Sequence, residues 1–391
     1  MQSLPLEGVR VADFTQALSG PYCTLLLADM GADVIKVERA GAGDDSRRWG
    51  PPFVGDTAAY FLSINRNKRS IELDLKSDEG RRAAIALVES CDIVVENWRP
   101  GTAERLGLGH ETLRARDPRL IYCAISGFGA DTPRPGYDQV VQGTSGWMSL
   151  TGSSEGEPFK TGVPIGDIAS GMFATQAILA ALVRRDRTKQ GGYVDIAMQD
   201  ALVSMLAYHA GSYFATAHAP VRNGNHHGTV APYGTFATAD GKVNIAVGND
   251  RQWRRLCESL KLPGMADDPR FFENRARLEH RDELHAVLEA ALSSESSATV
   301  LSAADDAGVP AGPIRNLAEV FTDPATHDRG MILEAEHPRL GTLRSPGSAW
   351  HLDGGTSTVL RPPPDLGEHT AEVLAELGVD TLNNRHAEVS A

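Results

Sequence analysis

The sequence is poor in cysteine, with four in 391 residues: Cys23, Cys91, Cys123 and Cys257. They are widely separated and form no CxxC pair, so neither a zinc site nor a disulfide framework is expected. No apolar run approaches the roughly 18 residues of a membrane helix, and the first residues, MQSLPLEGVRV, lack the regions of a signal peptide. We therefore expect a cytoplasmic protein without a metal or a membrane partner.

Positive charge is also in short supply. The chain has 38 Lys and Arg against 51 Asp and Glu, a formal net charge of −13. This balance argues against a nucleic-acid partner, which would need a surplus of cations. Within residues 35–105, however, twelve basic residues meet twelve acidic ones. Such a stretch is either a surface of ion pairs, the commoner case, or a site for a small polyanion.

The usual nucleotide and hydrolase motifs are missing. No GxGxxG follows the first predicted strand, and GxxxxGK[ST] and GxSxG are absent, so hydride, phosphoryl and serine-hydrolase chemistry are disfavoured. The pair His226-His227 has no carboxylate or HExxH context, and we interpret it as a loop feature rather than a metal site.

The first half of the chain alternates short apolar runs with helical patterns, which is typical of a parallel, Rossmann-like sheet. The predicted strands are 9–14, 34–37, 93–96 and 120–126, and the predicted helices begin at Gly20-Pro21 and cover 78–90, 111–116 and 171–185. The pattern changes after about residue 225. There Asp240-Gly241 predicts a hairpin within 233–247, and helices are expected at 252–260, 279–292 and 296–307. A tail helix is expected at 369–377. The fold class is therefore α/β with a smaller α+β domain.

One acid stands out in the segment GVPIGDIASG, residues 162–171. Asp167 lies among apolar and glycine residues just before a predicted buried helix. An Asp at this place is most often a helix N-cap. It can also be a nucleophile, because flanking Gly166 would admit a substrate and a helix N-terminus would keep the acid ionised. The residues alone leave both interpretations open.

The chain resembles the class III CoA-transferases nearly from end to end, the family that includes formyl-CoA transferase, the carnitine CoA-transferases and α-methylacyl-CoA racemase. The resemblance rests on many ordered segments, among them LEGVRVADFTQALSGP (6–21), LADMGADVIKVER (27–39), NRNKRSIELDLKSDEG (65–80), VVENWRPGTAERLGL (94–108), RPGYDQVVQ (134–142), GVPAGP (308–313) and LGEHT (366–370).

The resemblance implies a catalytic role for Asp167, as a nucleophile that carries the acyl group and then CoA. It also implies that coenzyme A binds along the first half, at Leu18, Ser19, Arg39, Leu73, Asp74, Leu75, Lys76, Asn97, Trp98, Arg99, Arg105 and Tyr137. Guanidinium groups such as those of Arg39 and Arg105 suit phosphate oxygens, and Lys76 would act as a point charge.

Two departures from formyl-CoA transferase argue against formyl-CoA and oxalate as substrates. Leu18 stands where formyl-CoA transferase has a Gln. The run of four glycines in that enzyme has no counterpart in this chain, where the nearest segments are 248–250 and 223–228. The racemase branch uses a His where this chain has Tyr137, which removes the group best suited to abstract a proton near neutrality. We therefore expect a transferase, with a racemase or a non-catalytic CoA-binding protein as alternatives.

The resemblance further implies a homodimer of two interlocked, ring-shaped protomers. It divides each chain into a large CoA-binding domain, residues 1–200 and 330–391, and a small domain, residues 225–325, joined by linkers at 201–224 and 326–329. The partners expected are an acyl-CoA donor, a carboxylic acid acceptor and a second copy of the chain.

Overall fold

The computed structural model describes residues 4–353, 355 and 359–379, which form two compact units. Unit 1 contains the chain up to Trp147, residues Lys160–Thr216, and the described residues from Pro324 onward. Unit 2 contains Met148–Phe159 and Ala217–Asp323. Each unit has its own hydrophobic core.

Unit 1 is built on a six-stranded sheet in which all neighbouring strands are parallel. In spatial order the strands are β5 (Lys68–Leu73), β2 (Asp33–Arg39), β1 (Arg10–Phe14), β6 (Ile93–Glu96), β7 (Ile121–Ser126) and β8 (Gly192–Ala197). Numbered along the chain, this order is 3-2-1-4-5-6, the order of the Rossmann fold. The predicted Rossmann-like parallel sheet is confirmed.

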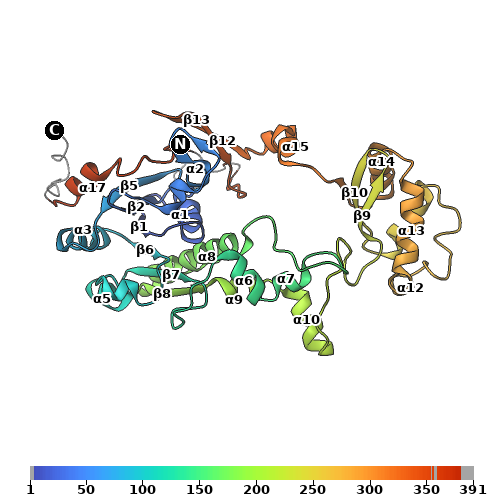
Figure 1. Ribbon diagram of the computed structural model, residues 1–391, viewed down its shortest axis with the longest axis horizontal. Coiled ribbons are helices and arrows are strands. Elements are labelled where there is room, and N and C mark those ends of the chain that lie inside the picture. Colours follow the sequence, from blue (N-terminus) through green and yellow to red (C-terminus); the bar gives the residue numbers. More distant parts are fainter. Residues whose placement is uncertain (1–3, 354, 356–358, 380–391) are drawn as a thin grey trace. The chain divides into compact units, whose positions relative to one another are not determined.

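Helices cover both faces of this sheet (Figure 1). One face packs on α1 (Ser19–Asp29), α8 (Ile165–Thr188) and α9 (Met198–Ser204), and the other on α3 (Asp78–Glu89), α5 (His110–Arg116) and α17 (Thr370–Glu376). Val11 and Val34 face the first set, whereas Ala12 and Ile35 face the second. The alternation follows from the strand's two-residue period, and burial on both sides explains why these strands are apolar throughout.

The C-terminal segment returns to unit 1 and is held there by arginines of the sheet. Arg69, nearly buried, pairs with Asp33, Glu372 and Glu376, and Arg10 also reaches Glu376. The other elements of unit 1 are short: η1 (Asp45–Arg48), β3 (Phe53–Val54), β4 (Thr57–Ala58), α2 (Ala59–Ile64), α4 (Thr102–Arg105), α6 (Asp138–Thr144), α10 (Ala207–Thr216), α16 (Pro324–Asp328), β12 (Ile332–His337) and β13 (Gly341–Pro346). Helix α7 (Trp147–Leu150) lies at the boundary between the units.

Unit 2 packs helices on an antiparallel three-stranded sheet of order β11-β10-β9. Its elements are β9 (Tyr233–Thr238), β10 (Gly241–Ala246), α11 (Asp250–Ser259), α12 (Asn274–Glu279), α13 (Arg281–Leu292), α14 (Ser297–Ala307), β11 (Ala311–Pro313) and α15 (Leu317–Thr322). The predicted Asp240-Gly241 hairpin is confirmed. Trp253 fills the core, and fully buried Arg277 donates to the carbonyl oxygens of Ala231 and Phe271.

Two helix predictions need correction. The helix predicted over 171–185 begins six residues earlier, at Ile165, and ends at Thr188. The helix predicted over 279–292 is α13 alone, because α12 ends at Glu279 and His280 separates the two. Long α8 is also apolar enough to cross a membrane by length and composition, but it packs on α1, α9 and the sheet.

Candidate active site

The site lies where the sheet reverses its strand order. Strands β1 and β6 are neighbours, and the chain leaves β1 toward α1. Parallel sheets bind ligands at the carboxyl ends of the strands at such a switch point. Here the amide of Gln16 donates to Asn97 Oδ1 at 2.8 Å, and Asn97 Nδ2 donates back to the Gln16 carbonyl oxygen at 2.7 Å. The two loops at the switch point are therefore tied together.

Helix α8 brings Asp167 to this edge. Its N-cap is Pro164, which makes no side-chain cap, and Asp167 lies inside the first turn. The interpretation of Asp167 as an N-cap is therefore wrong. Helices α1 and α8 approach closely at Gly171, where a Cβ atom would lie 2.7 Å from the carbonyl oxygen of Ser19. Glycine is needed there because any side chain would push the two helices apart.

Ser19, the first residue of α1, lies beside Asp167. Its hydroxyl and its backbone N–H both act on the carboxylate and lower its pKa. These two groups, and the start of α8, favour the charged form. Burial outweighs them, and the negative charge of Asp138 adds to it, so that the pKa of Asp167 rises to about 7. Of the predicted site residues, Ser19 and Asp167 are thus brought into contact.

Asp138, which the resemblance does not include among the site residues, contacts the first turn of α8 next to Asp167. Its Oδ1 accepts the Gly166 amide of α8 at 2.8 Å, and its Oδ2 accepts Gln142 Nε2 at 2.7 Å. A Cβ on Gly166 would lie 3.0 Å from Asp138 Oδ1 and 2.9 Å from Val141. Asp138 therefore caps α8 from a neighbouring helix. The only sequence signal was its place beside Tyr137 in the segment RPGYDQVVQ.

Tyr60 is a second residue that the sequence did not single out. It packs with Leu18, Tyr22 and Ile168 in a small apolar cluster, and its ring meets Trp49 edge-on at 5.3 Å between centroids. Burial raises the pKa of Tyr60 to about 12, and the charge of Asp167 contributes to the rise. Apolar and aromatic side chains therefore lie on one side of Asp167.

The residues predicted to bind CoA follow the carboxyl ends of consecutive strands. Leu18 and Ser19 follow β1, Arg39 ends β2, Leu73 ends β5 with 74–76 in the turn beyond it, and 97–99 follow β6. Arg105 closes α4, and exposed Tyr137 precedes α6. Leu73 is buried in the core, so its side chain serves packing. The side chains of Arg39, Lys76, Arg99 and Arg105 are exposed.

The charge-balanced stretch 35–105 has a mixed role. Five of its twelve basic residues are buried and ion-paired: Lys36, Arg47, Arg66, Lys68 and Arg69. The balance therefore reflects interior ion pairs as well as the exposed cations at the strand ends. Burial of a lysine depends on partners from distant segments, which the local sequence does not indicate.

Comparisons with known proteins agree on one family. The family model described as CoA-transferase family III matches residues 6–370. Succinyl-CoA:glutarate CoA-transferase of Mus musculus is 41% identical over 95% of this chain and 86% of its own. Succinyl-CoA:mesaconate CoA-transferase of Haloarcula marismortui is 42% identical over 97% of this chain and 98% of its own. The crystal structure of a CAIB/BAIF family protein from Brucella suis has a TM-score of 0.86 at 40% identity, covering 96% of this chain and all of that one.

Proposed function

Because this chain belongs to CoA-transferase family III and is a CoA-transferase, we propose that it moves CoA between two carboxylic acids through covalent intermediates on Asp167. The observation that carries the proposal is the environment of the Asp167 carboxyl group. The group is half-buried, stands near the like charge of Asp138, and has the N–H and hydroxyl of Ser19 beside it.

This environment favours acylation of the carboxylate. Burial and Asp138 disfavour the charged form, which is why the pKa rises to about 7. Conversion to an anhydride or a thioester removes the charge and relieves both effects. Near neutral pH a substantial fraction is still ionised, so the nucleophile is present. The group is therefore available as a nucleophile and is stabilised once it is acylated.

The reaction proceeds in four steps that conserve atoms. Asp167 attacks the thioester of the donor, forming an aspartyl-acyl anhydride and releasing CoA thiolate. The thiolate attacks the aspartyl carbonyl, so the donor acid leaves with one oxygen from Asp167. The acceptor carboxylate attacks the resulting aspartyl-CoA thioester, forming a second anhydride and thiolate. The thiolate then attacks the acceptor carbonyl, giving the new acyl-CoA and an Asp167 carboxylate that contains one acceptor oxygen.

The N–H and hydroxyl of Ser19 stabilise the intermediates that form when the aspartyl carbonyl is attacked. Both groups lie beside the Asp167 carboxyl group and favour its charged form, so they stabilise the negative charge that develops there in each tetrahedral intermediate. The exposed cations Arg39, Lys76 and Arg105 hold the phosphates of CoA at the same edge of the sheet. The apolar flank with Tyr60 limits hydrolysis of the intermediates.

We propose dicarboxylic acids as the exchanged substrates. The names of the mouse and archaeal relatives, which pair succinyl-CoA with glutarate or mesaconate, support this choice. Succinyl-CoA is then the first donor to test, with glutarate and mesaconate as acceptors. Cytoplasmic location remains a prediction.

We further propose that two chains form the interlocked homodimer implied by the resemblance, with units 1 and 2 as its large and small domains. Helix α10 supports a partner, because none of its residues is buried and Phe214 is 81% exposed. Helix α8 also exposes Met172 and Val183. Such apolar faces are costly in water unless they are covered. Light scattering at low protein concentration tests this, and a stable active monomer would contradict it.

The chemical step is tested by trapping. The enzyme is mixed with succinyl-CoA, quenched with hydroxylamine, and digested for mass analysis. We expect a hydroxamate on Asp167, and none in Asp167→Asn, which should also lose transfer. Asp186→Asn is the matched control, because Asp186 is an exposed acid at the other end of α8. Transfer retained by Asp167→Asn would contradict the proposed function.

A further inference from the structure

The turn that carries Ser19 to Asp167 has an unusual backbone. Ala17 adopts the left-handed conformation, with φ at 66°. Non-glycine residues hold this conformation only where the surroundings enforce it. The turn runs from Thr15 to Leu18 and leads directly into the first turn of α1.

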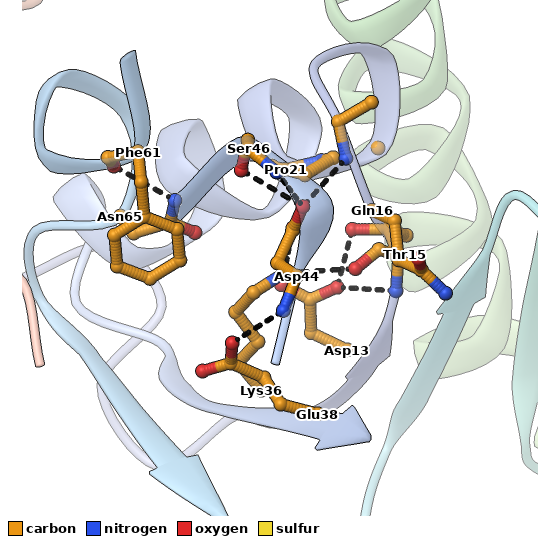
Figure 2. Close-up of polar contacts among 12 residues, drawn as sticks. Asp13, Thr15, Gln16, Pro21, Lys36, Glu38, Asp44, Ser46, Phe61 and Asn65 are labelled. Carbon is orange, nitrogen blue, oxygen red and sulfur yellow. Dashed lines mark hydrogen bonds and ion pairs between the residues drawn. The ribbon is translucent and has the colours of Figure 1, made fainter. Parts of the chain in front are cut away.

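Buried Asp13 and half-buried Asn97 bind the backbone on the N-terminal side of Ala17, and buried Asp44 binds Ala17 itself. Asp13 Oδ1 accepts the Thr15 amide at 2.9 Å, and Asn97 binds both the amide and the carbonyl oxygen of Gln16. The amide of Ala17 itself donates to Asp44 Oδ1 at 3.2 Å. The conformation is thus enforced from outside the turn. Figure 2 shows Asp13 and Asp44 beside Thr15 and Gln16.

Two fully buried lysines bind one carbonyl oxygen at the start of the turn and one in the first turn of α1. Lys36 Nζ donates to the Thr15 carbonyl oxygen at 2.8 Å, and Lys68 Nζ donates to that of Pro21 at 2.9 Å. Asp44 lies 2.9 Å from Lys36 and Asp13 lies 3.2 Å from Lys68, and all four side chains are inaccessible to solvent. Burial lowers the pKa of Lys36, but the charges of Asp44 and Asp13 raise it by more than burial lowers it. The pKa therefore lies above its usual value and this lysine stays charged.

Asp44 connects the turn to the rest of the network. Its amide donates to Glu38 Oε2 at 2.9 Å, and its Oδ1 also accepts the amide of Ser46 at 2.9 Å. Glu38 is in turn held by buried Arg47. A carboxylate fixed in this way can hold both Lys36 and the amide of Ala17 in one geometry.

We propose that Asp44 and Lys36 are positioning residues of the catalytic reaction, which hold the turn 15–18 so that the N–H and hydroxyl of Ser19 stay aimed at Asp167. This inference rests on the proposed role of Asp167 and deepens it. Neither residue touches the reacting atoms; both act through Thr15, Ala17 and Ser19.

The sign of a pH effect separates positioning from simple electrostatics. The N–H and hydroxyl of Ser19 favour ionised Asp167, so moving them away raises the pKa of Asp167 further. Removing the negative charge of Asp44 acts in the opposite direction, because a like charge disfavours ionisation. An upward shift of the acidic limb of activity in an Asp44 variant therefore reports displacement of the turn.

The test measures the rate of Asp167 acylation by succinyl-CoA in a single turnover, from pH 5 to 9, in the full-length enzyme. Asp44→Ala should slow acylation by about tenfold to a hundredfold and move the acidic limb to higher pH. Asp44→Asn keeps an oxygen for the Ala17 amide and should recover most of the rate. Asp29→Asn is the matched control, because Asp29 is equally buried and pairs with buried Arg66 at the other end of α1. It should leave the pH limb in place.

A neutral double variant covers the case in which Asp44→Ala does not fold. Lys36→Met/Asp44→Asn removes both buried charges together, which proteins tolerate better than removing one. It still lacks the ammonium group that donates to the Thr15 carbonyl oxygen. We therefore expect slow acylation, with the acidic limb of the pH profile shifted to higher pH. A wild-type rate and limb in this double variant, or in folded Asp44→Ala, overturns the inference. Failure of the proposed function itself gives a different result, because Asp167→Asn would then remain active.

Discussion

Replacing the Asp167 carboxyl group by an amide should stabilise the protein while abolishing its activity. Burial and Asp138 raise the pKa of Asp167 from 3.8 to about 7, which corresponds to a cost of about 4 kcal/mol for the charged form in the folded state. Asp167→Asn removes this cost. The amide has one acceptor oxygen where the carboxylate has two, which reduces the gain in stability. We therefore expect the free energy of unfolding to rise by about 2–4 kcal/mol at pH 8.

The pH dependence follows from the direction of the shift. Below about pH 4 the carboxyl group is protonated in the folded and the unfolded chain, so it makes no difference to stability. Between about pH 4 and 7 the unfolded chain loses this proton while the folded chain keeps it, and the wild type loses stability relative to the variant. Above about pH 7 the difference is constant. Between pH 5 and pH 8 the advantage of Asp167→Asn should grow by about 2.5 kcal/mol.

Denaturant titrations of both proteins at several pH values, at one fixed protein concentration, measure this difference. Asp186→Asn serves as the control, because its exposed carboxyl group should contribute little at any pH. Two results would refute the conclusion that folding disfavours the charged form of Asp167: a variant no more stable than the wild type at pH 8, or a stability difference that does not change with pH.

Three further substitutions test neighbouring parts of the account. Asp138→Asn keeps an oxygen for the Gly166 amide but removes the like charge, so the acidic limb of kcat/KM should move to lower pH; an unchanged limb would contradict the coupling. Gly171→Ala should lower kcat by at least about tenfold, measured at saturating substrate, because its methyl group meets the carbonyl oxygen of Ser19. Arg69→Ala should destabilise unit 1 by about 1–3 kcal/mol in denaturant titrations, because it releases α17; unchanged stability would show that the C-terminal helix is held by other contacts.

The sheet could be predicted from sequence because its signals are local. The apolar run ending at Phe14 and the Gly20-Pro21 helix start lie where expected, within a residue or two. The predicted start of α8, at residue 171, is wrong because the true first turn depends on contacts with another helix. Pro164 and Gly166 suggest a loop, yet Gly166 is needed because Asp138 and Val141 approach it from another helix.

The site itself was only partly visible in the sequence. The residues alone leave Asp167 as either a helix cap or a nucleophile. The family resemblance is confirmed, and the catalytic role that it implies for Asp167 remains a proposal. Asp138, Tyr60 and the buried lysines escaped notice because their significance depends on partners from distant segments. Lys36 looked like one more cation in a balanced stretch, whereas its ammonium group is buried against Asp44 and the Thr15 carbonyl oxygen.

The central claim, that Asp167 is covalently involved in transfer, is tested most directly by following oxygen. The enzyme is incubated with succinyl-CoA and an acceptor acid whose carboxylate oxygens are oxygen-18, and peptides are then analysed by mass. In the proposed sequence one acceptor oxygen remains on Asp167 after each turnover. The peptide containing Asp167 should therefore gain the mass of at least one heavy oxygen in the wild type. Transfer that proceeds while this peptide stays unlabelled would contradict the account.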